Sequence, residues 1–217
     1  MNRPARILIA DDHQLLADAC RTLLEPEFVV VGTVTDGRHV ASAVAELSPN
    51  IVLLDVYMPR LNGLDAGDQI KKKNPKIKLV FMTMTPAADV AAEAFRRGAS
   101  GYVLKQSAGT ELLCAVRMVQ QGKSYLSPLI AKETVTSLLY TKNTYKEKNT
   151  ITHRQREILQ LLAEGMSMKQ VASEIDVKPG TVAFHKYRMM EILKVTSNAE
   201  LLGYALKNQM IQSRVFE

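Results

Sequence analysis

The chain has 217 residues, of which 47% are hydrophobic and 23% are charged, a balance typical of a globular protein with one large or two modest domains. No apolar run approaches the roughly 18 residues of a membrane span, and residues 1–4 lead into an alternating apolar stretch without a signal-peptide core. We therefore expect a cytoplasmic protein without membrane contact, and the net charge of +6 suggests an anionic partner.

The first 123 residues alternate short β-rich segments with helical ones. The predicted strands are residues 6–10, 28–33, 51–54, 77–83 and 101–104. The predicted helices lie near residues 13–24, 37–47, 63–73, 87–97 and 109–121. The central strands are continuous apolar runs, as in parallel strands that are covered on both faces. This alternation predicts a doubly wound five-stranded α/β domain, in which functional residues gather at the carboxyl ends of the strands.

The pattern changes after residue 123. Residues 128–140 predict one more helix, and the polar residues 141–150 are typical of a linker. Beyond them every segment is helical. Three pairs have the spacing of a capping box: Thr152 with Gln155, Ser167 with Gln170, and Ser197 with Glu200. We therefore divide the chain into an α/β domain (1–123), a helix with a flexible linker (124–149) and an all-α domain (150–217).

Two cysteines, Cys20 and Cys114, lie in apolar helical segments without the spacing of metal ligands. A protein that stays in a reducing compartment rarely forms disulfides. We therefore expect both thiols to be buried and reduced.

Polar side chains follow four of the predicted strands where each strand ends. Asp11 and Asp12 follow the first, Asp55 the third, Thr83 the fourth and Lys105 the fifth. In a parallel sheet these residues converge at one edge. Like charges raise each other's pKa, so three crowded carboxylates require a cation, and hard oxygen ligands suit Mg²⁺. A cation, an ammonium and a hydroxyl beside a carboxylate would stabilise an incoming phosphoryl group.

Other interpretations of these residues carry less weight. A lone aspartate at a strand end is more often a helix cap or a turn residue, but five suitable residues at matching strand ends favour a site. Phosphatases of the haloacid dehalogenase type need a second aspartate two residues after the nucleophile, where this chain has Tyr57. The phosphate-binding loop, the nucleophile elbow and the zinc-protease motif do not occur in the sequence. We therefore expect no turnover of an external substrate.

The order and spacing of these residues resemble the receiver domain of bacterial response regulators. The resemblance covers about residues 5–122. It rests on the following motifs: Asp11-Asp12, Leu53-Leu54-Asp55-Val56-Tyr57-Met58-Pro59, Gly63, Thr83, and Gly98-Ala99-Ser100-Gly101-Tyr102-Val103-Leu104-Lys105. It implies a flavodoxin-like sheet with strand order 2-1-3-4-5.

The resemblance also implies a role for each site residue. Asp55 would be the phosphoacceptor. A sensor histidine kinase or a small acyl phosphate would supply the phosphoryl group. Asp12, Asp55 and the backbone carbonyl of Tyr57 would bind Mg²⁺, with Asp11 acting largely through water. Lys105 would pair with the acyl phosphate.

Two further residues would form the switch. Thr83 would move to hydrogen-bond the phosphoryl group, and Tyr102 would rotate inward. An aromatic side chain in a buried strand is usually core, and this interpretation of Tyr102 stays open. The change would be a two-state equilibrium biased by a local charge.

The helical domain has the pattern of a helix-turn-helix. Residues 151–165 predict an amphipathic helix ended by a glycine, residues 166–175 a second helix, and residues 181–193 a third after a tight turn. The order resembles the LuxR-type DNA-binding domain of NarL/FixJ response regulators over about residues 150–215. The third helix would enter the major groove of double-stranded promoter DNA. The last helix, residues 199–212, would form a dimer contact or simply close the core.

The predicted recognition helix has an unusual outward face. Val182, Met189, Ile192 and Leu193 would face inward, and His185 lies beside this stripe, where a structural role is at least as plausible as a DNA contact. The family often carries lysine where this chain has Ala183. The candidate DNA contacts are Lys178, Thr181, Phe184, Lys186, Tyr187 and Arg188. This surface is less cationic and more aromatic than the family pattern.

The leading hypothesis is a two-component response regulator in which Mg²⁺-dependent phosphorylation of Asp55 promotes homodimerisation and promoter binding, and so regulates transcription. The atypical recognition helix motivates an alternative, a receiver-based protein-interaction regulator with weakened DNA binding. An aspartyl-phosphate phosphatase has little support.

Overall fold

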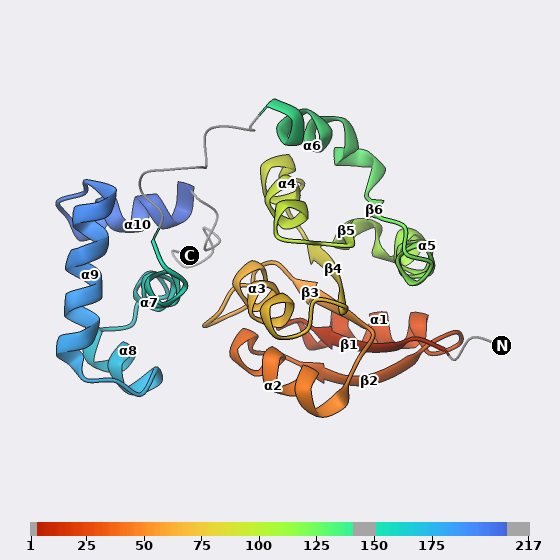
Figure 1. The fold of residues 1–217 in the computed structure, drawn as a ribbon, viewed down its shortest axis with the longest axis horizontal. Coiled ribbons are helices and arrows are strands. Elements are labelled where there is room, and N and C mark those ends of the chain that lie inside the picture. The colour runs from red at the N-terminus through yellow and green to blue at the C-terminus, as the bar shows by residue number, and fades with distance from the viewer. Residues whose placement is uncertain (1–3, 141–150, 208–217) are drawn as a thin grey trace. The chain divides into compact units, whose positions relative to one another are not determined.

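The computed structural model describes residues 4–140 and 151–207. The chain divides into two compact units, residues 1–143 and 144–217, which we call the first and the second unit (Figure 1). The predicted linker, residues 141–150, lies outside the described residues. None of the described helices is both long enough and apolar enough to span a membrane.

The first unit is built on a parallel sheet with strand order β2-β1-β3-β4-β5-β6. The strands are β1 (Arg6–Ala10), β2 (Val29–Val34), β3 (Ile51–Asp55), β4 (Lys78–Thr83), β5 (Gly101–Leu104) and β6 (Tyr125–Leu126). The helices are α1 (Gln14–Leu24), α2 (Gly37–Leu47), α3 (Gly63–Lys73), α4 (Ala88–Arg96), α5 (Ala108–Gln120) and α6 (Pro128–Tyr140), with a 3₁₀ turn at Lys105–Ser107. The predicted doubly wound sheet and the order of its first five strands are confirmed.

Successive residues of each strand point to opposite faces of the sheet, so the unit has two cores. One core joins α1 and α5 to residues such as Ile9 and Leu53. The other joins α2, α3 and α4 to residues such as Leu8 and Leu54. The continuous apolar runs in the central strands follow from this double coverage, because both faces of each strand are buried.

The sixth strand was not predicted, and the helix after it was predicted as part of the segment between the two domains. β6 is two residues long and pairs in parallel with β5. Ser127, which follows it, is fully buried. Its amide donates to the carbonyl of Tyr102 at 3.0 Å, and its hydroxyl accepts from the amide of Leu104 at 3.0 Å and donates to Glu111 at 2.5 Å. These bonds fasten the start of α6 to β5, and Figure 1 shows α6 lying along α4.

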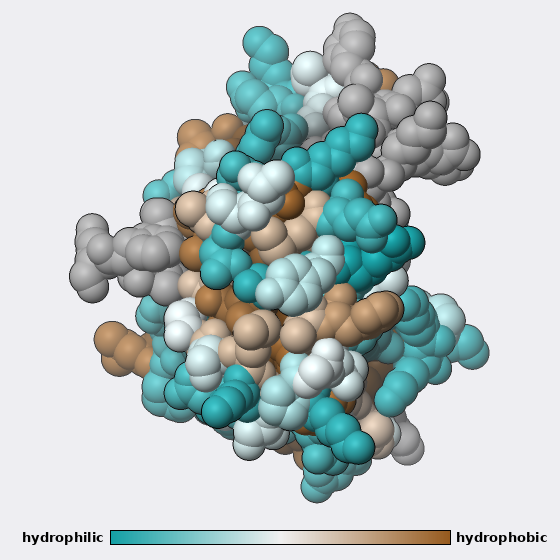
Figure 2. Space-filling model, turned by 90° about the vertical axis from the view of Figure 1, so that its left-hand side faces the viewer, coloured by the Kyte–Doolittle hydropathy of each residue, from teal (hydrophilic) through white to brown (hydrophobic). Residues whose placement is uncertain are grey.

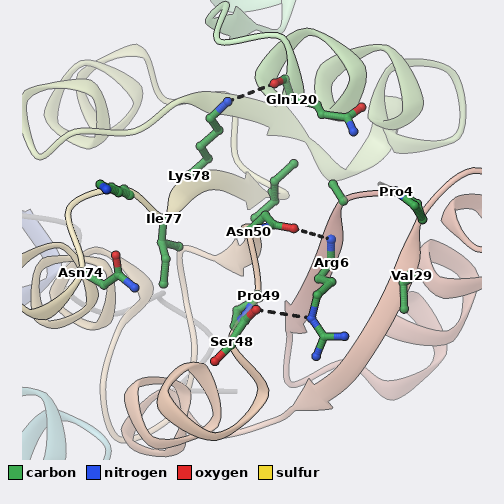
Figure 3. A pocket seen from close by; sticks show the side chains of 13 residues that line it. Pro4, Arg6, Val29, Ser48, Pro49, Asn50, Asn74, Ile77, Lys78 and Gln120 are labelled. Carbon is green, nitrogen blue, oxygen red and sulfur yellow. Dashed lines mark hydrogen bonds between the residues drawn. The ribbon is translucent and has the colours of Figure 1, made fainter. Parts of the chain in front are cut away.

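At the amino ends of the strands, a pocket is lined by basic, amide, proline and aliphatic residues (Figure 3). Arg6 donates to the carbonyl of Leu47 at 2.7 Å, at the end of α2. Lys78 donates to the carbonyl of Val119 at 2.7 Å, near the end of α5. Helix C-termini leave carbonyls without intrahelical partners, and cations there are favourable. These two side chains therefore serve the fold at the edge opposite to the carboxyl ends.

The second unit contains α7 (His153–Ala163), α8 (Met168–Glu174), α9 (Pro179–Leu193) and α10 (Asn198–Lys207) among its described residues. Their apolar faces meet in one core. The capping boxes at Thr152 and Ser167 are confirmed. The third predicted box is wrong in one half: Ser197 accepts from the amide of Glu200, but the Glu200 carboxylate accepts from Thr196 at 2.7 Å.

Three further predictions concern the start of α9, the burial of the two cysteines and the end of the last helix. α9 begins at Pro179, two residues before the predicted start, because proline has no amide to satisfy and suits the first helical turn. Cys20 is buried as predicted, but Cys114 is exposed. The prediction for Cys114 is wrong because its position on α5 faces away from the sheet. The predicted last helix extends to residue 212, of which the part after residue 207 lies outside the described residues.

Candidate functional site

The carboxyl ends of the parallel strands bring together the residues that the sequence pattern singled out. Asp55 ends β3, Thr83 ends β4, and Asp11 and Lys105 directly follow β1 and β5. All four are buried. Because β1 lies between β2 and β3, and β4 between β3 and β5, these ends are neighbours although they are distant in sequence.

Lys105 lies between two buried carboxylates. Its Nζ is 2.8 Å from Oδ2 of Asp55 and 2.9 Å from Oδ2 of Asp11. Burial and the charge of Asp11 raise the pKa of Asp55 to about 6, although Lys105 lowers it. Burial lowers the pKa of Lys105, but the two carboxylates outweigh this effect and raise it. The ammonium is therefore held charged beside a carboxylate that ionises near neutral pH.

Backbone amides fix the orientation of both carboxylates. The amide of Tyr57 donates to Oδ1 of Asp55 at 3.2 Å, and the amide of His13 donates to Oδ1 of Asp11 at 3.0 Å. Gly63 packs against the loop that follows Asp55. A Cβ at this position would lie 1.9 Å from the carbonyl oxygen of Asp55, so the close approach requires glycine.

Four side chains at this edge could hold a metal ion: Asp11, Asp12, His13 and Asp55 offer ligand atoms that all lie within 4.8 Å of one another. Asp12 is the most open of the three carboxylates, with a side chain that is 33% exposed. Lys105 neutralises only one unit of the charge on the three carboxylates. The donor set therefore fits a hard divalent cation. His13 was not predicted as a site residue, but its Nδ1 lies 3.0 Å from Asp12. Its position directly after Asp11 and Asp12 could have indicated it as a possible metal ligand.

Thr83 and Tyr102, the two predicted switch residues, are not among these possible metal ligands. Thr83 follows Met82, the register partner of Asp55, and its Oγ1 accepts from the amide of Thr85 at 3.2 Å. Tyr102 is fully buried in the core that includes α4. Its hydroxyl lies close to the Thr83 side chain but makes no hydrogen bond of standard geometry within residues 4–140. Burial, with Tyr57 and Asp55 nearby, raises the pKa of Tyr102.

The outward face of α9 carries the candidate DNA contacts. Val182 and Met189 are buried, as predicted, whereas Ile192 and Leu193 are half-buried. Phe184 and Tyr187 are 67% and 62% exposed. The remaining candidates on this helix or at its start are Lys178, Thr181 and Arg188, which are exposed, and Lys186, which is half-buried. Figure 2 shows the molecule from the side of α9, where apolar and weakly polar side chains run between hydrophilic ones.

The charges on this face are partly engaged within the helix. Arg188 lies 2.5 Å from Glu191, and the Lys186 ammonium lies 5.4 Å from the centre of the Tyr187 ring. His185 is half-buried, and its Nδ1 is buried without a hydrogen-bond partner in the described part of the second unit. This position favours a structural role for His185.

Comparison with known proteins agrees with both units. Residues 7–117 match the family of the response regulator receiver domain, and residues 149–205 match the bacterial regulatory proteins of the luxR family. The nitrate/nitrite response regulator protein NarL of Escherichia coli is 32% identical over 200 residues, which cover 91% of this chain and 93% of that protein. The oxygen regulatory protein NreC of Staphylococcus aureus is 32% identical over 215 residues, which cover 95% of this chain and 99% of that protein.

Solved structures show the same architecture. A two-component response regulator of the LuxR family from Aurantimonas is 32% identical, with a TM-score of 0.60, and the match covers 63% of this chain and 99% of that one. The response regulator RcsB of Salmonella typhimurium is 25% identical, with a TM-score of 0.57, over 92% of this chain and 98% of that one. The chain therefore belongs to the NarL/FixJ family of two-component response regulators, with a receiver domain followed by a LuxR-type helix-turn-helix DNA-binding domain.

Proposed function

We propose that this response regulator accepts a phosphoryl group on Asp55 from a sensor histidine kinase, and that phosphorylation promotes homodimerisation and binding to promoter DNA. The observation that carries the proposal is the environment of Asp55. One carboxylate oxygen accepts from a backbone amide, and the other contacts the Lys105 ammonium at 2.8 Å. A buried carboxylate with an adjacent fixed cation is suited to accept a charged group.

The transfer step follows from this geometry. A carboxylate oxygen of Asp55 attacks the phosphorus of a phosphohistidine, and an O–P bond forms as the P–N bond breaks. The leaving imidazole nitrogen takes up a proton. Asp55 must be ionised to attack, so its pKa of about 6 leaves it reactive at neutral pH. A small acyl phosphate would serve in the same way, with a P–O bond broken and a carboxylate released. No external substrate is turned over.

Asp12, Asp55 and the backbone carbonyl of Tyr57 would hold Mg²⁺, with Asp11 acting largely through water. The bound ion would supply positive charge that stabilises the phosphoryl oxygens. The chain's own part is to place the ligands: Asp11 is fully buried beside Lys105, and the Asp12 side chain is more exposed. Lys105 remains as the partner of the phosphorylated side chain.

Thr83 and Tyr102 would convey the change of charge. The Thr83 hydroxyl would donate to a phosphoryl oxygen, and its movement would leave space that the Tyr102 ring fills. The buried position of the Tyr102 ring, beside Thr83 and in the core that includes α4, supports this role. Such a rearrangement is a two-state equilibrium that phosphorylation biases.

The second unit would bind DNA through α9 in the major groove. The proposed contacts are Lys178, Thr181, Phe184, Lys186, Tyr187 and Arg188. Leu201 and Ala205 of α10 are buried, which supports a role of this helix in closing the core. Its half-buried Leu202 and Tyr204 would then supply the dimer contact.

The phosphorylation proposal is tested with labelled acetyl phosphate and Mg²⁺. We expect the wild-type chain and an Asp18→Asn control to be labelled, because Asp18 is an exposed carboxylate of α1 that is not among the site residues. The Asp55→Asn variant should not be labelled. Full labelling of this variant would refute the assignment of the phosphoacceptor.

A second candidate function is regulation through protein partners, with weak DNA binding. The pairing of Arg188 with Glu191 favours it, because this pair reduces the positive charge that α9 presents. Measuring the affinity for promoter DNA against a non-specific competitor, with an Arg188→Ala control, discriminates between the two. Absent or salt-insensitive binding would favour the partner-based function.

A further inference from the structure

Two aromatic side chains dominate the free face of the recognition helix. Among the described residues of the second unit, Phe184 and Tyr187 are the large hydrophobic side chains that are exposed. They are three residues apart on α9 and therefore share one face, opposite to the buried Val182 and Met189. Exposed apolar groups gathered on one face of a small domain indicate an interaction surface.

The Phe184 ring is held in place without being part of the core. It packs edge-to-face on the ring of His185, with centroids 5.6 Å apart and planes inclined by 71°. His185 is itself half-buried. A ring that is supported from one side and exposed on the other loses little conformational freedom when it binds a partner.

The surroundings of Phe184 do not favour readout through hydrogen bonds. Ala183 beside it offers only a methyl group. The guanidinium of Arg188 is engaged by Glu191, and the ammonium of Lys186 lies near the Tyr187 ring. The centre of the face is therefore apolar, while cations lie at its margins, including Lys178 at the start of the helix. Marginal cations suit the phosphates of DNA.

We infer that Phe184 is a specificity-determining residue that contacts the 5-methyl group of thymine in the major groove. The inference rests on the proposed DNA binding of this unit and names the base that the helix selects. Thymine is the base that carries a methyl group in the major groove, and apolar side chains, including phenylalanine, recognise it by contact. Residues near the N-terminus of a recognition helix reach the base edges, and Phe184 lies in the first half of α9.

The test uses the full chain, phosphorylated with acetyl phosphate, and a pool of random-sequence DNA duplexes. After selection of the bound duplexes, the same pool is copied once with dTTP and once with dUTP, which removes each thymine methyl and preserves every hydrogen-bonding group. We expect wild type to bind the uracil copy about fourfold more weakly for each contacted thymine, the factor for one buried methyl group. The Phe184→Ala variant should bind both copies equally.

Matched variants separate the contact from general effects on the helix. Phe184→Leu keeps an apolar side chain and should retain part of the preference. Ser173→Ala, at an exposed position of α8 outside the proposed contacts, should retain all of it. Replacing a contacted thymine by 5-methylcytosine should preserve more affinity than replacing it by cytosine, because the methyl group stays. All proteins should show the same dependence of affinity on salt, since the phosphate contacts are unchanged.

The possible outcomes distinguish the inference from the function on which it rests. Salt-dependent binding with equal affinity for the thymine and uracil copies would overturn the role of Phe184 and leave DNA binding intact. Absence of salt-dependent binding by the wild-type chain would overturn both. The comparison of the two copies needs no substitution in the protein, so a folding defect in a variant cannot produce the expected result.

Discussion

Replacing Asp55, the proposed phosphoacceptor, should make the receiver more stable. Asp55 is 2% exposed, and its pKa is raised from 3.8 to about 6, mainly by burial. A shift of about two units at about 1.36 kcal/mol each corresponds to about 3 kcal/mol. This value already includes the attraction of Lys105. Because the asparagine of the Asp55→Asn variant cannot ionise, we expect its receiver to gain up to about 3 kcal/mol of unfolding free energy at neutral pH.

The sign of the pH dependence follows from the direction of the shift. The folded chain binds the Asp55 proton more tightly than the unfolded chain does, because the folded pKa is the higher one. The unfolding free energy of wild type therefore falls as pH rises between 3.8 and about 6. Above that range the whole destabilisation by ionised Asp55 is present. Below pH 3.8 the carboxyl group is neutral in both states. The advantage of Asp55→Asn should thus disappear in acid.

The assay is urea unfolding of the full chain, followed by circular dichroism, at a series of pH values in the presence of a chelator. The chelator is needed because a metal ion bound to the folded state would stabilise wild type. Added Mg²⁺ should therefore narrow the difference between the two proteins. Asp18→Asn, which removes an exposed carboxylate from α1, is the control and should change stability little. The reasoning would be refuted if Asp55→Asn were less stable than wild type at neutral pH. It would also be refuted if the gain in unfolding free energy over wild type were the same at every pH.

Two further predictions concern Gly63, which packs against the loop after Asp55, and Lys186 of α9. Gly63→Ala should destabilise the receiver by about 1–3 kcal/mol through overpacking and slow the labelling of Asp55, because the new Cβ would meet the Asp55 carbonyl oxygen. Gly109→Ala, which has open space around its Cβ, is the control for thermal unfolding, and an equal loss in both variants would contradict the explanation. Lys186→Gln should lower the slope of log affinity against log salt concentration by about one, measured on one DNA duplex. An unchanged slope would exclude a phosphate contact.

Much of the receiver could be predicted from the sequence for a definite physical reason. Continuous apolar strands that alternate with helices favour parallel pairing, and parallel strands bring their carboxyl ends to one edge. The meeting of Asp11, Asp55 and Lys105 therefore followed from their positions after apolar runs, and the contacts of 2.8 and 2.9 Å agree with it. The capping boxes at Thr152 and Ser167 were readable because their bonds are local.

Two of the features that escaped prediction depend on how separate segments pack together, and the third is a choice between two local partners. β6 is too short to leave a periodic pattern, and its pairing with β5 is accompanied by the hydrogen bonds of the buried Ser127 with Leu104 and Glu111. The exposure of Cys114 depends on which side of α5 meets the sheet, which an apolar local sequence does not reveal. Glu200 bonds to Thr196 rather than completing a capping box, although the spacing suited either partner.

By itself, the sequence determined the family and the two-part organisation, and it predicted Asp55 as the reactive carboxylate, because each depends on residue types at fixed spacings along the chain. Only the tertiary structure decided how strongly Asp55 holds its proton, why Gly63 must be a glycine, and which side chains α9 presents to a partner. The close approach of the backbone to the Asp55 carbonyl decides the second, and burial decides the other two. Burial is set by contacts among strands and helices that lie apart in the sequence. The aromatic face at Phe184 and Tyr187 is the clearest case, since its exposure follows from the packing of Val182 and Met189 into the core on the opposite side of the same helix.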